Sequence, residues 1–190
     1  MASLLVAIIR ALLPIINRVH TVVLGIKPRG QSIISVEVRH HRGRTVRLQD
    51  GCEVKPGDPV IKLHLNNARI EEKRSASSGL RSRVFPRGFG YHFKDGLQLL
   101  AEEVAAGKYD SIVAIYGWTA LPAHAKRFGF QIVDLPNNLR IRLAGLHITA
   151  LMQAHRIPWF EKRTTSRKTI EIKAIWLSRR ELLRIHGSAS

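Results

Sequence analysis

The chain has 190 residues, enough for one domain with a sizeable core. Its hydrophobic fraction of 45% excludes an intrinsically disordered chain, and its single cysteine, Cys52, excludes an intrachain disulfide framework. The charge is unusual, because 31 Lys and Arg residues against 14 Asp and Glu residues give a formal net charge of +17. Such a surface attracts anions, so the expected partners are nucleic acid, an anionic membrane surface, or an acidic or phosphorylated ligand.

The first 24 residues contain the most apolar stretch, which runs from Leu4 to Leu24. Arg10 and Arg18 make a membrane-spanning helix costly there. No basic residue precedes the apolar run and no small-residue cleavage site follows it, as a signal peptide would require. We expect an amphipathic helix. It either packs in the core or in an oligomer contact, or it lies at a membrane interface. A membrane span or a signal peptide is the remaining alternative.

Residues 33–65 predict an antiparallel meander. Apolar and polar residues alternate over 33–40, 45–48 and 59–65, which is typical of half-buried strands. Asp50-Gly51 is a hairpin signal. Residues 74–91 then contain Ser, Gly and Arg but no acid, which predicts an exposed, flexible basic loop.

The next part of the chain predicts a βαβ-like unit. A helix begins at Asp95 as N-cap and ends at Gly107, and a short apolar strand follows over 111–116. Gly117-Trp118-Thr119 is expected to form a tight turn before a helix over 120–128 and a strand over 130–135. This order indicates a parallel pair or a mixed sheet.

Helical periodicity returns over 139–155, a basic loop follows over 162–168, and 169–177 alternates as a strand. Ser178 is the expected N-cap of a last helix over 179–185. The whole pattern predicts a single domain, residues 1–190, of the α/β class with an α+β mixed sheet. In it an N-terminal antiparallel meander precedes the βαβ-like unit, and helices flank the sheet, including the hydrophobic one at the N-terminus.

No motif for a metal, a nucleotide or a catalytic serine is present, and we expect no metal and no cofactor. Two places are candidates for ligand binding, since ligands of α/β proteins gather beyond the carboxyl ends of strands. The first is His64, Asn66 and Asn67 at the end of the third predicted strand, for which a structural histidine and turn asparagines are the alternative. The second is formed by residues 116–119 and the following helix, where a plain helix cap and core packing are the alternative. Its members are Tyr116, Gly117, Trp118, Thr119 and His124.

The predicted basic loops supply the candidates for anion contact. Phe85, Phe89 and Tyr91 lie among arginines in the first loop, a composition that suits a polyanion, although a solvated basic surface explains it equally. The candidate cations are Arg81, Arg83, Arg87, Lys162, Arg163, Arg167 and Lys168.

Several short motifs are similar to a known family. Leu48-x-Asp50-Gly51, followed by Gly57-Asp58-x-Val60-x-x-Leu63-His64-Leu65-x-Asn67, resembles the opening motif of the YkoP-like domain family of bacteria. Gly117-x-Thr119 and Arg127-Phe128-Gly129-Phe130 resemble its Gly-x-Thr turn and Leu-Gly-Phe signature, with Phe128 in place of leucine. Trp176-Leu177-Ser178-Arg179 is compatible with the family as well, so the resemblance spans residues 5–185.

The resemblance implies a cell-envelope setting, because members occur alone or joined to polysaccharide deacetylases and other envelope-sugar enzymes. The metal and catalytic motifs of those deacetylases are not found in this chain. The basic stretch at 74–91 is longer than the family leads us to expect.

Three functions remain open from the sequence. The leading hypothesis is an accessory domain at a membrane surface or in the cell envelope that binds an anionic lipid, a phosphate-bearing glycan precursor or a partner enzyme. Such a protein would be cytoplasmic or peripheral at the inner face of the membrane. The second is a small transferase-like enzyme for an anionic substrate at Gly117–Thr119, and the third is non-specific binding of nucleic acid.

Overall fold

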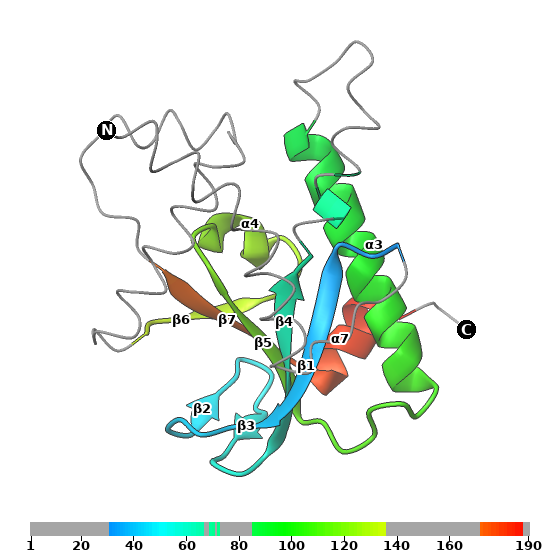
Figure 1. The fold of residues 1–190 in the computed structure, drawn as a ribbon. Coiled ribbons are helices and arrows are strands. Elements are labelled where there is room, and N and C mark those ends of the chain that lie inside the picture. The colour runs from blue at the N-terminus through cyan, green and yellow to red at the C-terminus, as the bar shows by residue number, and fades with distance from the viewer. Residues whose placement is uncertain (1–30, 67–68, 71, 73–84, 136–171, 188–190) are drawn as a thin grey trace, which may run out of the picture.

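The computed structural model describes residues 31–66, 69–70, 72, 85–135 and 172–187 (Figure 1). The predicted N-terminal helix at 1–24, the helix at 139–155 and the basic loop at 162–168 lie outside the described residues. The elements, in chain order, are β1 (Ile34–His40), β2 (Val46–Arg47), β3 (Glu53–Val54), β4 (Pro59–Leu65), α3 (Phe85–Ala105), β5 (Ala114–Thr119), α4 (Pro122–Lys126), β6 (Gln131–Val133), β7 (Lys173–Ser178) and α7 (Arg179–His186).

A five-stranded sheet with the order β1-β4-β5-β7-β6 forms the centre of the fold. Its neighbours are antiparallel except for β4 and β5, which run parallel. Parallel neighbours need a long crossover, and here α3 supplies it between β4 and β5. The mixed α+β sheet predicted from the sequence is confirmed.

The structure adds the order of the strands, which the sequence does not contain. β1 pairs directly with β4 over its whole length, from Ile34 opposite Leu65 to His40 opposite Pro59. The short strands β2 and β3 pair with each other as a separate hairpin. β5 and β6 do run parallel, as the βαβ-like unit predicts, but β7 lies between them.

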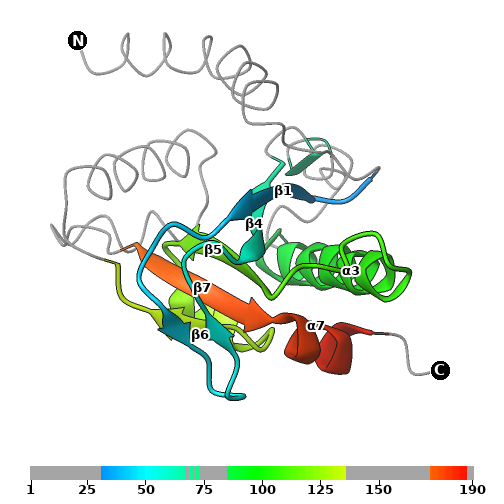
Figure 2. The ribbon, with the colours of Figure 1, turned by 90° about the horizontal axis from the view of Figure 1, so that it is seen from below.

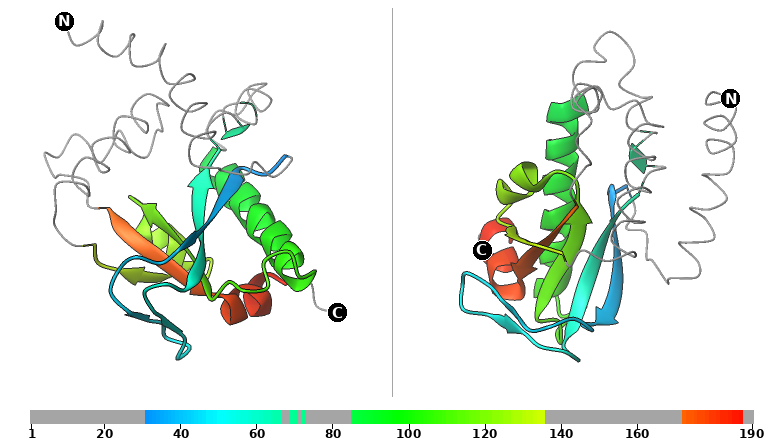
Figure 3. Two further views of the ribbon diagram at one scale, coloured as in Figure 1. Left: turned by 60° about the horizontal axis from the view of Figure 1, so that its bottom comes forward. Right: turned by 90° about the vertical axis from the view of Figure 1, so that its left-hand side faces the viewer.

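The helices cover one face of the sheet. In the right-hand view of Figure 3 the three helices lie on one side of the strands, and Figure 2 shows α3 and α7 next to each other. This side holds the larger core, in which Leu97, Leu100 and Val104 of α3 pack against Ile61 and Ile115 of the sheet. Helix α7 begins as predicted, because Ser178 Oγ accepts a hydrogen bond from the Glu181 amide at 3.0 Å.

A smaller core lies on the opposite face, which none of the described helices covers. Leu48 and Val54 of the hairpin region belong to it together with Val60, Ala114 and Trp176 of the sheet. The hairpin therefore packs over this face and gives Trp176 a buried environment, with 5% of its surface exposed.

Helix α3 begins at Phe85, well before the predicted start at Asp95. Residues 85–91 of the predicted flexible basic loop are therefore helical, and Asp95 lies inside the helix. Aromatic packing accounts for the difference, since Phe93 contacts Phe89 and Phe128 with ring centroids 6.0 and 5.0 Å apart. Phe128 is distant in sequence, so the composition of the loop does not reveal this contact.

Helix α3 approaches β1 so closely that a side chain at Gly96 has no room. A Cβ atom there would lie 2.7 Å from Ser32 Oγ and 2.9 Å from Ile34 Cδ1. We expect Gly96→Ala to lower the free energy of unfolding by about 1–3 kcal/mol, because either the helix or the buried Ser32 and Ile34 side chains must shift. Chemical denaturation of the purified variant measures the effect.

Gly90→Ala is the matched control on the same helix, since its Cβ would meet only Phe128 Cζ, at 3.8 Å. We expect this variant to be as stable as the unaltered protein or more stable by up to about 1 kcal/mol, because alanine favours helix. Equal stabilities of the two variants would contradict the close packing of α3 on β1.

Candidate functional site

Five side chains gather on the face of β1, β4 and β5 that lies opposite α3, which we call the polar sheet face. They are Glu37, Lys62, His64, Tyr116 and Trp118. Alternate residues of a strand point to the same face, and the register places Lys62 beside Glu37 on one side and Tyr116 on the other. His64 and Trp118 follow two residues later on their strands and so occupy the next position along the same face.

Glu37 and His64 form a partly buried pair. His64 Nε2 lies 2.8 Å from Glu37 Oε2, and 15% and 11% of the two side chains are exposed. A carboxylate accepts hydrogen bonds, so Nε2 of His64 is the donor in this pair. Arg39 Nη1 lies 3.6 Å from Glu37 Oε1. The carboxylate of Glu37 therefore fixes the orientation of the imidazole.

Aromatic rings border this pair. Lys62 Nζ lies 5.1 Å from the centre of the Trp118 ring, a cation–π contact that orients the ammonium group. Tyr116 stacks on Trp176 with ring centroids 4.6 Å apart, and His41 meets the Trp176 ring edge-on at 5.3 Å. The polar sheet face therefore combines a cation, a carboxylate–imidazole pair and flat apolar surfaces.

The structure brings together three of the predicted ligand-binding residues, namely His64, Tyr116 and Trp118. The prediction of a tight turn at Gly117-Trp118-Thr119 is wrong, because β5 continues through Thr119 and pairs there with Lys173 of β7. Local sequence suggested a turn, whereas strand pairing with a segment far along the chain keeps these residues extended.

The other predicted residues are placed elsewhere. Asn66 Oδ1 accepts a hydrogen bond from the Arg69 amide at 3.2 Å, the turn role named above as the alternative. A Cβ at Gly117 would contact Ile175 and Leu63 of the larger core, so this residue does not line the polar sheet face. Thr119 Oγ1 accepts from the Leu121 amide at 2.9 Å, and Leu121, not Thr119, is the N-cap of α4.

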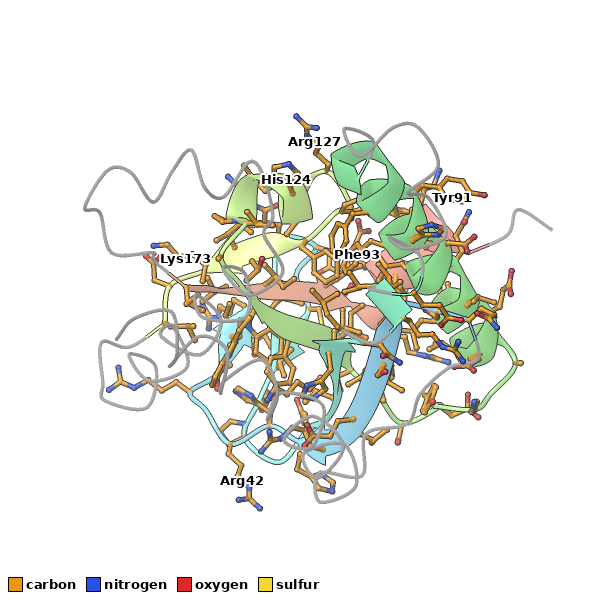
Figure 4. All side chains as sticks on the ribbon, turned by 45° about the horizontal axis from the view of Figure 1, so that its top comes forward. Arg42, Tyr91, Phe93, His124, Arg127 and Lys173 are labelled. Atoms are coloured by element: carbon orange, nitrogen blue, oxygen red, sulfur yellow. The ribbon has the colours of Figure 1, made fainter. Side chains whose placement is uncertain are left out.

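His124 is exposed on α4, away from the polar sheet face. Figure 4 shows it beside Arg127, with both side chains on the outside of the molecule. Of the predicted anion contacts, Arg87 lies in α3. Asn67 and the remaining candidates lie outside the described residues, and these are Arg81, Arg83, Lys162, Arg163, Arg167 and Lys168.

A cavity of about 560 Å³ lies at the other end of the sheet, where the sequence suggested no site. It is lined by Asp50, Gly51, Cys52, Val113, Ser178, Arg179, Arg180 and Leu183. Both the Leu48-x-Asp50-Gly51 and the Trp176-Leu177-Ser178-Arg179 motifs contribute to it. Both motifs can be read from the sequence. The contact between Asp50 and Ser178, which are 128 residues apart, cannot.

The polar groups of this cavity bind one another. Ser178 Oγ donates to Asp50 Oδ2 at 2.6 Å, the Cys52 amide donates to Asp50 Oδ1 at 3.1 Å, and Arg180 Nη2 lies 3.2 Å from Asp50 Oδ2. Burial alone would raise the pKa of Asp50, but these hydrogen bonds and the charge of Arg180 outweigh it and lower the pKa below its ordinary value. The contacts tie the hairpin turn to the start of α7.

The same cavity contains the thiol of Cys52. Burial and then the charge of Asp50 raise the pKa of this thiol, which disfavours the reactive thiolate. Within the described ranges, no three His, Cys, Asp or Glu side chains are placed to hold a metal ion. We therefore interpret the cavity as a structural junction and the polar sheet face as the candidate site.

Fold and surface define the class of protein: a strongly basic α+β domain with a mostly antiparallel sheet and helices on one face. The model of the YkoP domain matches residues 5–186, and the chain belongs to that family, as its motifs predicted. The chain is similar to the uncharacterized protein YkoP of Bacillus subtilis (strain 168). The two are 28% identical over 109 residues, which cover 56% of this chain and 58% of that protein. No solved structure matches the chain.

Proposed function

We propose that this domain binds an anionic membrane surface with one end of the molecule, as an accessory domain in the cell-envelope setting that the family resemblance implies. The observation that carries the proposal is the position of three basic segments. Residues 1–30, 73–84 and 136–171 contain 15 of the 31 Lys and Arg residues but only 2 of the 14 acids.

All three segments join the described fold at the same end of the sheet. Residues 1–30 precede β1, residues 73–84 lie between β4 and α3, and residues 136–171 connect β6 to β7. β4 and β6 run in the same direction, and β1 and β7 run in the opposite one. The start of β1, the ends of β4 and β6, and the start of β7 therefore lie at one end, which we call the basic end (Figure 1).

Ion pairs balance much of the charge in the rest of the fold. Arg47 pairs with Glu53 at 2.8 Å, Lys108 with Glu103 at 2.8 Å, and Arg184 with Glu181 at 2.6 Å. The excess positive charge is thus concentrated in the segments that join the basic end. Exposed Lys126 and Arg127, at the end of α4, follow the carboxyl end of β5 and add to it.

A lipid surface fits these segments better than nucleic acid does. Residues 4–24 and 139–155 each contain two arginines together with many aliphatic residues. Such mixed segments suit a membrane interface, where aliphatic side chains enter the acyl boundary and cations meet the phosphates. None of the helices in the described residues is long and apolar enough to cross a membrane.

Vesicle co-sedimentation tests the proposal with the full chain. We expect binding to phosphatidylcholine vesicles that contain phosphatidylglycerol, weaker binding at high salt, and little binding to pure phosphatidylcholine. Replacing Lys162, Arg163, Arg167 and Lys168 with glutamine is expected to weaken binding by up to about 100- to 1000-fold, because each cation near the surface contributes about 1 kcal/mol.

The matched control removes the same charge from ion-paired positions, by glutamine at Arg47, Lys55, Lys108 and Arg184. It should retain affinity within a few fold. Equal losses in the two variants would show that net charge alone matters, and tighter binding to a DNA duplex than to the anionic vesicles would favour nucleic acid. The proposal is refuted by equal losses in the two variants, by tighter binding to the DNA duplex, or by no binding to the anionic vesicles.

A further inference from the structure

We infer that His186, at the carboxyl end of α7, is a pH-sensitive latch. The neutral ring holds this end of α7 on the turn between α4 and β6, and the protonated ring releases it. This inference goes beyond membrane binding, because none of the basic segments takes part in it. It rests on the burial of the ring and on the different surroundings of its two nitrogen atoms.

The turn at residues 127–130 joins α7 to the rest of the helical layer. Phe128 of this turn packs on Phe93 of α3, with ring centroids 5.0 Å apart, and α3 itself lies beside α7 (Figure 2). Gly129 adopts a φ of 86°, and a Cβ atom there would collide with Ile185 Cδ1 of α7. A helix of eight residues is not stable alone, so the position of α7 depends on such contacts.

His186 adds a hydrogen bond to this junction. The residue is 3% exposed, and its Nε2 lies 3.0 Å from the carbonyl oxygen of Phe128. A carbonyl oxygen only accepts, so the neutral ring carries its proton on Nε2 and none on Nδ1. Nδ1 is buried and has no hydrogen-bond partner among the described residues.

Protonation of His186 therefore places a proton on the nitrogen that lacks a partner. The new N–H group would be a buried donor without an acceptor, on a ring that has also become charged. Water can reach this proton only when the end of α7 moves away from the turn. The closed position of α7 is thus compatible with the neutral ring and opposed by the protonated one.

Charged groups on the surrounding elements do not compensate for the added charge. Lys94 of α3 is a cation whose charge disfavours a protonated His186. The basic residues at 126–127, at the end of α4, are exposed and carry the same sign. On α7 itself, Glu181 is paired with Arg184 at 2.6 Å.

The pKa of His186 gives the pH range in which the latch acts. Burial has the largest effect and lowers this pKa, the hydrogen bond to Phe128 raises it, and the charge of Lys94 lowers it again, so it lies below the ordinary value of 6.5. The unfolded chain therefore binds this proton more tightly than the folded one. Stability from the neutral ring is complete above pH 6.5 and is lost as the pH falls through the lowered pKa.

Amide hydrogen exchange of the full chain tests the latch at Gly187, whose amide donates to the Leu183 carbonyl at 2.9 Å. We expect its protection, corrected for the intrinsic effect of pH, to fall about tenfold between about pH 7.5 and pH 5. The reason is that a buried donor without an acceptor disfavours the closed position by about this factor or more. An NMR titration of the His186 ring should also give a lower pKa in the folded chain than in the chain unfolded by urea.

His186→Gln is the test variant, because its amide group can donate to Phe128 and does not titrate in this range. Its protection at Gly187 is expected to be the same at both pH values. His124→Gln is the matched control, since His124 is exposed on α4, and it should lose protection in acid as the unaltered protein does.

Three results would each overturn the inference. They are a His186 pKa in the folded chain that equals or exceeds that of the unfolded chain, unchanged protection at Gly187 in the unaltered protein, and an equal loss of protection in His186→Gln. The first two measurements need no substitution, so they decide the matter even if His186→Gln does not fold.

Discussion

Asp50→Ala is expected to lower the free energy of unfolding by about 2–4 kcal/mol. The Asp50 side chain is 9% exposed and accepts hydrogen bonds from the Ser178 hydroxyl and the Cys52 amide. Removal leaves those two donors without their acceptor, and each loss costs about 1–3 kcal/mol when the group is buried. Arg180 is mostly exposed, so solvent screens its part of the effect. Urea denaturation at neutral pH measures the change.

The matched control is Asp110→Ala, whose carboxylate is 74% exposed and 3.5 Å from Arg179. It should change stability by less than about 0.5 kcal/mol. Asp50→Asn keeps an acceptor for Ser178 and Cys52, and it should be less destabilising than Asp50→Ala. If Asp50→Ala costs no more than the control, the hairpin and α7 are not tied through this carboxylate.

The same carboxylate predicts a pH dependence. Because folding lowers the pKa of Asp50, the unfolded chain binds this proton more tightly, and stability from the group is complete above the ordinary pKa of 3.8. That contribution is lost as the pH falls through the lower, folded pKa. The stability difference between the unaltered protein and Asp50→Asn should therefore be constant at neutral pH and shrink in acid. A difference that grows toward acid pH would contradict the assigned direction.

Trp176→Ala is expected to have the largest effect, a loss of about 3–5 kcal/mol in the free energy of unfolding. Trp176 is 5% exposed, stacks on Tyr116 and receives the edge of His41. Its removal leaves a void between the sheet and the β2–β3 hairpin, whose own pairing is only two residues long. Thermal and urea unfolding, with hydrogen exchange at Leu48 and Val54, would measure both the global loss and the loosening of the hairpin.

Tyr91→Ala provides the comparison, because Tyr91 is 68% exposed on α3. We expect a change within about 0.5 kcal/mol for it. A Trp176→Ala variant that lost less than about 1 kcal/mol would mean that the hairpin does not depend on this ring.

Local patterns predicted many of the elements. Alternation predicted β1 and β4, the Ser178 cap predicted the start of α7, and Asp50-Gly51 predicted a turn, where Gly51 adopts a φ of 84°. These features depend on neighbouring residues, so the sequence contains the information that decides them. The start of α3 was different, because Phe93 of this helix packs against Phe128 and Phe130, which come from another part of the chain.

The candidate site was predicted in part. His64, Tyr116 and Trp118 were predicted as members of two separate candidate sites, both near the carboxyl ends of strands, and the two meet because β4 and β5 are parallel neighbours. Glu37 was not predicted as a site residue. The alternation of residues in a strand does not indicate which strand will be its neighbour, and so it does not show that Glu37 will contact His64. Lys62 was missed for the same reason, although strand periodicity already placed it on the side of His64.

The sequence by itself determined the family, the charge, its concentration in three acid-poor segments, and the strands and caps that depend on local spacing. The tertiary structure decided which strands are neighbours, that Asp50 meets Ser178, that Glu37 orients His64, and that the three basic segments join one end of the sheet. The physical reason is the range of the interactions. Periodicity and capping act over a few residues, whereas pairing and burial act between segments that only the folded chain brings into contact.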